Sequence, residues 1–242
     1  MNLIIDVGNT RVKVAVFKAN KLEYKDISAK ETFTNALVAI REQYPNIKKC
    51  IVSSVGNLNK KDLLFLKESY SVLELNHKTK IPFTNKYATP KTLGVDRIAL
   101  VASAAVQFPK VNCLLIDAGS CITYDFLSSK NEYYGGAIAP GIGLRYKSLE
   151  AFTANLPLLD KETPDGVIGD STNNAIHSGV INGVIFEIEG FIRSYREKYD
   201  DLTVILTGGD AHFLRDSLKN DIFANSNFLL EGLHYILEHN KD

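Results

Sequence analysis

The first seventeen residues, MNLIIDVGNTRVKVAVF (Met1–Phe17), contain two apolar segments with a short polar segment between them. Leu3–Ile5 is a continuous apolar run, which is typical of a buried strand. Val12–Phe17 alternates in the manner of a half-buried strand. Between them lies Asp6–Thr10, in which a Gly-Asn pair favours a tight turn. The stretch therefore predicts a β-hairpin.

The tip of this hairpin allows two interpretations. It is either a polar turn with no further role, or a turn that binds phosphate. In the second interpretation, Gly8 lets backbone N–H groups approach an anion closely, Thr10 offers a hydroxyl, and Asp6 holds a metal ion.

The same pattern occurs again in CLLIDAGSCITYDFL (Cys113–Leu127). Asp117 and Gly119 follow Asp6 and Gly8 at the same offset of 111 residues. Internal self-similarity of this kind indicates two structural units that share one plan. We therefore expect two similar halves, residues 1–111 and 112–242, each opening with a strand–turn–strand unit.

A third segment, LTVILTGGDAHFL (Leu202–Leu214), predicts a short strand, a glycine pair and a helix that begins near Ala211. A glycine pair at such a junction permits close approach of a nucleotide base or ribose. Two phosphate hairpins and this glycine turn resemble the parts of an actin-like phosphotransferase. We expect an α/β chain with two actin-like (ribonuclease H-like) domains in tandem and the ATP site in the cleft between them.

The segment NKYATPKTLGVDRIALVASAAVQF (Asn85–Phe108) predicts a loop followed by a helix with an apolar face. Asp96 falls in the first helical turn, where the helix dipole alone would favour an acid. Arg97 follows directly. A carboxylate that can accept a hydroxyl proton, beside a guanidinium that can hold a carboxylate, suits a kinase whose acceptor is both an alcohol and an acid.

At this segment the sequence resembles the type III pantothenate kinases. The arrangement N-x-Y-x-x-P-x-x-L-G-x-D-R-x-A is filled by Asn85, Tyr87, Pro90, Leu93, Gly94, Asp96, Arg97 and Ala99. The resemblance extends through Asp6–Lys13, Asp117–Asp125, Gly135–Leu149, Ala154–Leu159, Gly169–Gly179 and Thr207–Ala211. These matches span nearly the whole chain in order. The second hairpin departs from the family pattern, because Ser120 and Cys121 stand where the family has threonine and alanine.

The resemblance implies that the chain transfers the γ-phosphate of ATP to the primary hydroxyl of pantothenate, giving 4'-phosphopantothenate in the first step of coenzyme A biosynthesis. It implies ATP as phosphoryl donor, Mg²⁺, and a monovalent cation, K⁺ or NH₄⁺. It also implies a homodimer.

The same resemblance assigns roles to individual residues. Asp96 is expected to be the catalytic proton acceptor. The expected ATP-binding residues are Asp6, Val7, Gly8, Asn9, Thr10, Arg11, Val12, Lys13 and Ser120. The expected pantothenate-binding residues are Tyr87, Gly94, Val95, Asp96, Arg97 and, from the neighbouring subunit, Thr172. Asp117 is expected to bind the monovalent cation, and Asp6 to lie near Mg²⁺.

The segment from Ser171 to about Lys198 predicts a long helix with small residues at Ala175, Gly179 and Gly183. Such a stripe lets another backbone approach closely. It suits packing within the chain and contact between two helices of a dimer equally well. The resemblance favours the dimer.

Composition excludes some classes of function. Lysine plus arginine equals aspartate plus glutamate at 28 each, which argues against nucleic-acid binding through bulk charge. No apolar stretch approaches the ~18 residues that span a bilayer. The three cysteines form no C-x-x-C pair, and Cys50 and Cys113 each lead into an apolar strand, as expected for buried thiols in a reducing compartment. We expect a cytoplasmic protein that binds neither nucleic acid nor membrane.

Two other functions fit parts of the pattern. One is a regulatory relative that binds nucleotide or pantothenate without catalysis, in the manner of an accessory transcription factor. The other is a sugar kinase of the same fold. The presence of Asp6, Asp96, Arg97 and Asp117 favours the enzyme over the regulator, and the L-G-x-D-R segment argues against a sugar kinase.

Overall fold

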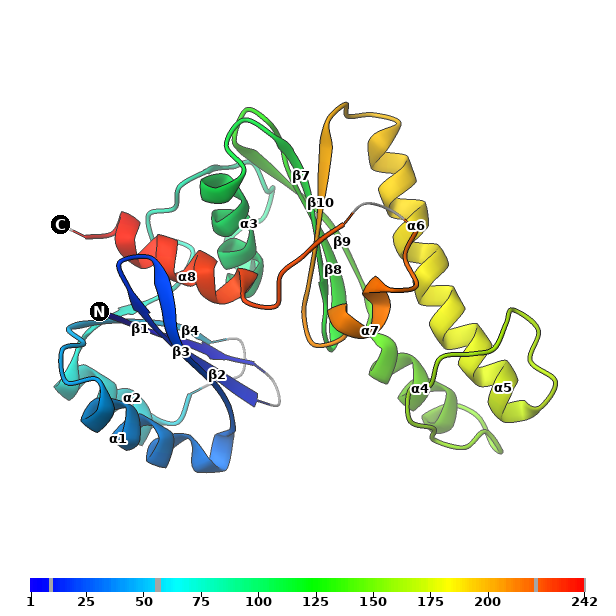
Figure 1. Cartoon of the computed structure of the whole chain (residues 1–242), viewed down its shortest axis with the longest axis horizontal. Helices are drawn as coiled ribbons and strands as arrows, with labels where there is room; N and C mark the ends of the chain where they lie inside the picture. Colours follow the sequence, from blue (N-terminus) through cyan, green and yellow to red (C-terminus); the bar gives the residue numbers. More distant parts are fainter. Residues whose placement is uncertain (9–10, 55–57, 220–221, 242) are drawn as a thin grey trace. The chain divides into compact units, whose positions relative to one another are not determined.

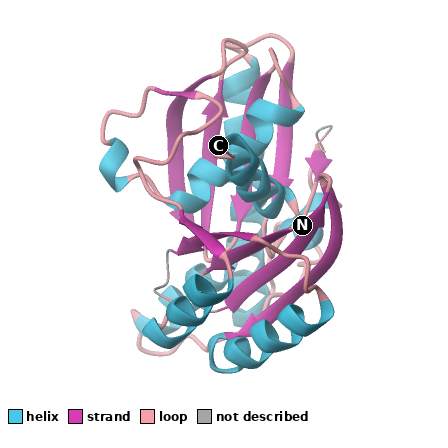
Figure 2. Cartoon of the chain, turned by 90° about the vertical axis from the view of Figure 1, so that its left-hand side faces the viewer, coloured by secondary structure: helices cyan, strands magenta, loops and turns pink. Residues whose placement is uncertain are grey.

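The structure, a computed structural model, describes residues 1–8, 11–54, 58–219 and 222–241. The chain divides into two units. The first unit comprises Met1–Gln107 and Asn227–Asp242, and the second comprises Phe108–Ser226. Figures 1 and 2 show the helices and strands of both units.

The first unit is built on a sheet with strand order β3-β2-β1-β4-β5. Its strands are β1 (Asn2–Val7), β2 (Arg11–Lys18), β3 (Lys21–Ala29), β4 (Lys49–Ser54) and β5 (Ser71–Glu74), and the unit also contains the short strand β6 (Thr84–Asn85). The central strand β1 pairs antiparallel with β2 and parallel with β4. All six residues of β1 are buried, which explains its continuous apolar run.

Helices cover both faces of this sheet (Figure 1). They are α1 (Phe33–Gln43), α2 (Lys60–Ser69), α3 (Val95–Gln107) and α8 (Phe228–His239), with 3₁₀ turns at Lys30–Thr32 and Pro90–Thr92. Phe33 and Leu37 of α1 and Leu66 of α2 pack against alternate residues of β1, such as Leu3 and Ile5. On the other side α8 contacts β1 and β4, and α3 packs along α8.

The sheet of the second unit runs β11-β10-β7-β8-β9. Its strands are β7 (Asn112–Ala118), β8 (Cys121–Leu127), β9 (Glu132–Pro140), β10 (Leu202–Thr207) and β11 (Phe223–Ala224). Its helices are α4 (Ile142–Ala151), α5 (Thr172–His177), α6 (Gly183–Arg196) and α7 (Ala211–Arg215). The π-helical segment Ser178–Asn182 joins α5 to α6 without a break, so the predicted long helix is confirmed.

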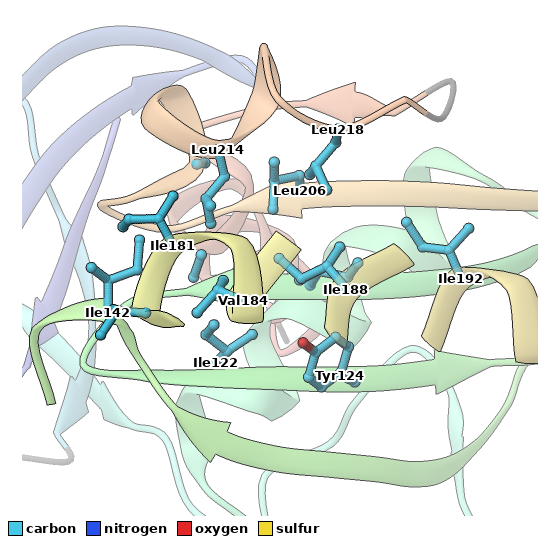
Figure 3. Close-up of a cluster of buried hydrophobic side chains, with 14 of the residues drawn as sticks. Ile122, Tyr124, Ile142, Ile181, Val184, Ile188, Ile192, Leu206, Leu214 and Leu218 are labelled. Atoms are coloured by element: carbon cyan, nitrogen blue, oxygen red, sulfur yellow. The ribbon is translucent and has the colours of Figure 1, made fainter. Parts of the chain in front are cut away.

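The core of the second unit lies between α6 and one face of this sheet (Figure 3). Val184 and Ile188 of the helix meet Ile122 and Tyr124 of β8. Since Ile122 and Tyr124 alternate along the strand, Thr123 between them belongs to the opposite face. This register places the polar residues of the hairpin away from the core.

The predicted repeat is confirmed as two antiparallel hairpins. In the first hairpin Asp6 pairs with Lys13, and in the second Asp117 pairs with Thr123. In both hairpins the acid lies next to the end of a buried strand that also has a parallel neighbour, β4 in the first unit and β10 in the second.

The observed division of the chain differs from the predicted halves 1–111 and 112–242 at the first boundary, which falls after Gln107, and in the last segment. Residues 227–242 belong with the first unit, because α8 packs on α3 and on β1. The apolar face of α8 supplies the layer that the first sheet lacks on that side. The similarity of the two hairpins could not predict that the last segment of the chain belongs with the first unit.

One helix in the described residues, Thr172–Arg196, is long and apolar enough to cross a membrane by length and composition, with a hydropathy of 1.3. This differs from the expectation that no stretch approaches that length. The same test is passed by core helices, and 44% of this window is buried inside the protein. Its buried side chains pack on the sheet as described above.

The helix α3 is buried on nearly all sides and not on one face alone, since every residue from Arg97 to Ala104 is buried. Its neighbour α8 approaches so closely that a Cβ added at Gly232 would overlap the carbonyl of Ala99. Only glycine fits this crossing.

We therefore predict that Gly232→Ala lowers the free energy of unfolding by about 3 kcal/mol, because the backbone of α3 must move. Chemical denaturation followed by circular dichroism measures the effect. Gly143→Ala in α4 is the matched control, since a Cβ there meets nothing within 4 Å. It should be neutral or raise stability by up to about 1 kcal/mol. Equal effects of the two variants would contradict the close crossing.

Candidate functional site

The turn of each hairpin is closed by its own glycine. The Gly8 N–H donates to the Arg11 carbonyl at 3.0 Å, and the Gly119 N–H donates to the Cys121 carbonyl at 3.0 Å. These two amides are therefore occupied within the turns. Asn9 and Thr10, which were expected to bind ATP, lie outside the described residues.

The Asp6 carboxyl lies at the end of β1 and is only 5% exposed. Lys13 is its register partner on β2, and Ser53 is its partner on β4. Burial raises the pKa of Asp6 to about 6; Lys13 opposes this rise, the carboxyl of Asp96 adds to it, and the Ser53 hydroxyl opposes it. Among the described residues, that hydroxyl has no well-aligned hydrogen-bond partner.

Asp96 lies in the first turn of α3 and accepts a hydrogen bond from the Arg97 N–H at 2.8 Å. A Cβ added at Gly94 would overlap the Asp96 carboxylate, so the glycine makes room for that side chain. Because Asp96 raises the pKa of Asp6, the two acids share one electrostatic environment within the first unit. These two carboxylates and the Ser53 hydroxyl beside Asp6 form an oxygen donor set that fits Mg²⁺.

Arg97 is 5% exposed, and its guanidinium carbon lies 5.6 Å from the centre of the Tyr87 ring. This distance allows a cation–π contact, which holds the guanidinium plane in place. The Tyr87 N–H in turn donates to the side-chain oxygen of Asn85 at 2.9 Å. The structure thus brings Tyr87, Gly94, Asp96 and Arg97 together, as the spacing of the motif predicts.

In the second unit, Asp117 lies at the end of β7 between Thr123 on β8 and Thr207 on β10. Gly208 has a φ of 99°, and a Cβ there would overlap the Asp117 carboxylate and the Ala118 carbonyl. The predicted close approach at the glycine pair is therefore present. The neighbours of Asp117 named here carry hydroxyl and carbonyl oxygens, which fit a monovalent cation.

The turn after Asp117 is held by a second glycine. The Gly141 N–H donates to the Ser120 carbonyl at 3.0 Å, and a Cβ at Gly141 would overlap Gly119 and Ser120. Ser120 itself is exposed at the tip. Its hydroxyl is thus presented on a turn whose backbone is fixed.

The remaining predicted residues differ in exposure. Val7 and Val12 are each 1% exposed and belong to the core, so any part they take in ATP binding comes from the backbone. Arg11 is exposed, and Val95 is half-buried. Thr172 is exposed at the start of α5 and lines a pocket of about 610 Å³ with Arg145, Leu149, Leu156 and Gly179 among others.

Three polar residues beside the acids were missed at the sequence level: Ser53, Thr123 and Thr207. Ser53 closes an otherwise apolar strand, and that change from apolar to polar was a usable signal. Thr123 and Thr207 become neighbours of Asp117 only through strand register, which the sequence pattern leaves open.

Comparisons with known proteins agree with this geometry. The family model described as type III pantothenate kinase matches residues 2–194. A protein of Christiangramia forsetii named type III pantothenate kinase is 52% identical over 100% of this chain and 99% of its own length. One of Flavobacterium johnsoniae with the same name is 50% identical over 100% and 99%.

Solved structures share the fold at low identity. A Campylobacter jejuni protein named after the Baf family of transcriptional activators has a TM-score of 0.66 at 22% identity, covering 98% of both chains. A glucokinase from an Antarctic psychrotroph has a TM-score of 0.52 at 13% identity, covering 99% of both chains. The chain therefore has the two-domain actin-like kinase fold that the hairpins predicted.

The raised pKa of Asp6 predicts how stability changes with pH in metal-free protein. The unfolded chain loses this proton near pH 4 and the folded chain near pH 6, so the free energy of unfolding falls across that window as pH rises. A pKa rise of about two corresponds to roughly 3 kcal/mol. Asp6→Asn should remove this fall and be more stable than the wild type above pH 6.

Urea denaturation between pH 3.5 and 8 in the presence of a chelator measures the difference. Asp165→Asn, which removes an exposed carboxylate, is the control and should keep the slope of the wild type. If Asp6→Asn also keeps that slope, burial does not raise the pKa of Asp6.

Proposed function

The chain belongs to the type III pantothenate kinase family, and we propose that it transfers the γ-phosphate of ATP to the primary hydroxyl of pantothenate, giving 4'-phosphopantothenate. The observation that carries this proposal is the grouping of Asp6, Asp96 and Arg97 within one unit. Lys13 opposes the rise of the Asp6 pKa, the Arg97 N–H donates to the Asp96 carboxylate, and the Arg97 guanidinium lies over the Tyr87 ring.

The acceptor side is assigned to the start of α3. Asp96 accepts the proton of the pantothenate hydroxyl as that oxygen attacks phosphorus, which is general-base catalysis. Arg97 holds the pantothenate carboxylate through its guanidinium, whose carbon lies over the Tyr87 ring. Gly94 leaves the space that the Asp96 carboxylate needs. Val95, between them, also contacts pantothenate.

The donor side is assigned to the two hairpins. Residues 6–13 and Ser120 bind ATP. Within this set, the Lys13 ammonium and the Arg11 guanidinium neutralise negative charge on the phosphates. Mg²⁺ held near Asp6 would neutralise phosphate oxygens, which is the main requirement of phosphoryl transfer. The Asp6 carboxylate then gains a partner that offsets the cost of its burial.

Asp117 is assigned to the monovalent cation, K⁺ or NH₄⁺. The support is its position at the end of β7 between two threonines and a tight glycine turn. A carboxylate with neutral oxygen neighbours suits a large, weakly hydrated cation.

We also propose a homodimer in which Thr172 reaches the neighbouring subunit's pantothenate. Cβ atoms added at Gly179 or Gly190 would meet nothing within 4 Å, so this helix surface is open. The second unit also has exposed apolar residues on α4, just after α4, on α6 and in the loop before α5: Leu144, Phe152, Phe186 and Ile168. Exposed apolar patches of this kind mark protein interfaces.

A cytoplasmic site of action fits these assignments, because both substrates and the product are small charged metabolites. The proposal includes no role for nucleic acid or for a membrane. The balanced charge of the chain supports the first of these assignments.

The function is tested by coupled measurement of ADP release with and without pantothenate, first in K⁺ and then in Na⁺ buffer. Pantothenate-dependent turnover that is faster in K⁺ is the expected result. Turnover that depends on a sugar instead would indicate another kinase. Nucleotide binding without turnover would indicate the regulatory relative.

We predict that Asp96→Asn lowers kcat by about 10²–10⁴-fold while the affinity for ATP stays within about twofold. The amide cannot accept the hydroxyl proton, but it preserves the shape of the turn. Steady-state kinetics and nucleotide titration separate the two effects. Reduced ATP affinity with unchanged turnover of the bound complex would remove Asp96 from the role of base.

We predict that Gly179→Leu yields folded monomers, because the added side chain projects into open space in one chain but blocks a second chain. Light scattering gives the mass and circular dichroism the helix content. Gly179→Ala is the matched control and should remain dimeric. A dimeric Gly179→Leu variant would show that this surface is not the interface.

A further inference from the structure

The two hairpin acids face different partners. Opposite Asp6 on the neighbouring antiparallel strand lies Lys13, and opposite Asp117 lies Thr123. Residues directly opposite in an antiparallel pair have Cβ atoms about 5 Å apart and project from the same face. One carboxylate therefore has an ammonium group beside it, and the other has a hydroxyl in the equivalent place.

The Thr123 hydroxyl is buried and makes no hydrogen bond within the described residues. A buried polar group without a partner costs about 1–3 kcal/mol. Ser53, beside Asp6, differs, because its hydroxyl acts on the Asp6 carboxyl. A hydroxyl without a hydrogen bond thus lies opposite Asp117, as expected where a ligand supplies the missing contact.

The chemistry next to Asp117 favours a particular ligand. Its third strand neighbour, Thr207, is 3% exposed and also carries a neutral oxygen. A divalent ion usually gathers several carboxylates or phosphates. Asp125, the next acid on this face of β8, already accepts a hydrogen bond from the Tyr133 hydroxyl at 2.6 Å. Asp117 with its two threonine neighbours suits a large monovalent cation.

We propose that Thr123 is a specificity-determining residue of the monovalent-cation subsite at Asp117, its hydroxyl supplying a neutral oxygen beside the carboxylate. This inference rests on the proposed function, which assigns that cation to Asp117. It adds to that subsite a residue on the strand opposite Asp117.

The test measures cation binding by stability and not by catalysis. The melting temperature of the full chain is recorded against K⁺ concentration, at constant ionic strength with choline chloride. Each titration is run without nucleotide and then with a non-hydrolysable ATP analogue. The variants are Thr123→Val, which has nearly the same shape but no hydroxyl, and Thr123→Ser, which keeps the hydroxyl. Thr203→Val on β10 is the matched control, since it removes a threonine hydroxyl four residues before Thr207.

The expected result is that Thr123→Val raises the K⁺ concentration for half-maximal stabilisation by about tenfold. Thr123→Ser and Thr203→Val should stay within about twofold of the wild type. Titration with Na⁺ and NH₄⁺ shows whether the preference among cations changes as well. In Thr123→Val, the concentrations of the three cations that give half-maximal stabilisation should become more alike.

Three results would overturn the inference, and they are distinguishable. If K⁺ stabilises the wild type and Thr123→Val equally, but fails to stabilise Asp117→Asn, the cation subsite stands and Thr123 has no part in it. If K⁺ stabilises neither the wild type nor Asp117→Asn in either nucleotide condition, the assignment of the cation to Asp117 fails together with the inference. If Thr123→Val does not fold, Thr123→Ser with a tenfold weaker K⁺ response would also overturn it.

Discussion

A carboxylate buried at the end of a central strand is the constraint on which the first unit depends. β1 is buried along its whole length, and its acid, Asp6, is the second-last residue of the strand. The raised pKa of Asp6 indicates that the charged carboxylate lowers the stability of the fold, because burial and Asp96 both disfavour the charged form. Lys13 and Ser53 offset part of the cost. A bound cation would offset the rest, so the site is arranged for a ligand at the expense of stability without one.

The second unit repeats the plan with different chemistry. Asp117 has the same place in its hairpin, yet threonines occupy its neighbouring strands. Glycines at 141 and 208 hold the following turn by close backbone packing that any side chain would prevent. Similar strand geometry therefore gives the two acids different neighbours, a lysine and a serine in the first unit and two threonines in the second.

Much of this arrangement follows from sequence patterns, and the missing parts have physical reasons. The hairpins, the helix after Gly94 and the strand before the glycine pair are local, since each depends on periodicity and turn chemistry within about fifteen residues. The partners of Asp6 and Asp117 are not local. Ser53 reaches Asp6 through parallel pairing of β1 with β4, and Thr207 reaches Asp117 through pairing of β7 with β10. Parallel register depends on packing across the whole sheet, so the sequence alone could identify the acids but not their neighbours.

The packing of α8 on α3 and β1 has a consequence for the order of events during synthesis. Residues 108–226 leave the ribosome before α8 does, and they contain every element of the second unit. That unit can acquire its native contacts while the first still lacks one of its covering layers. Until α8 arrives, the apolar side of β1 and α3 is uncovered and open to association with other nascent chains. The glycine at 232 then lets the backbone of α8 approach the Ala99 carbonyl of α3 when the two helices dock.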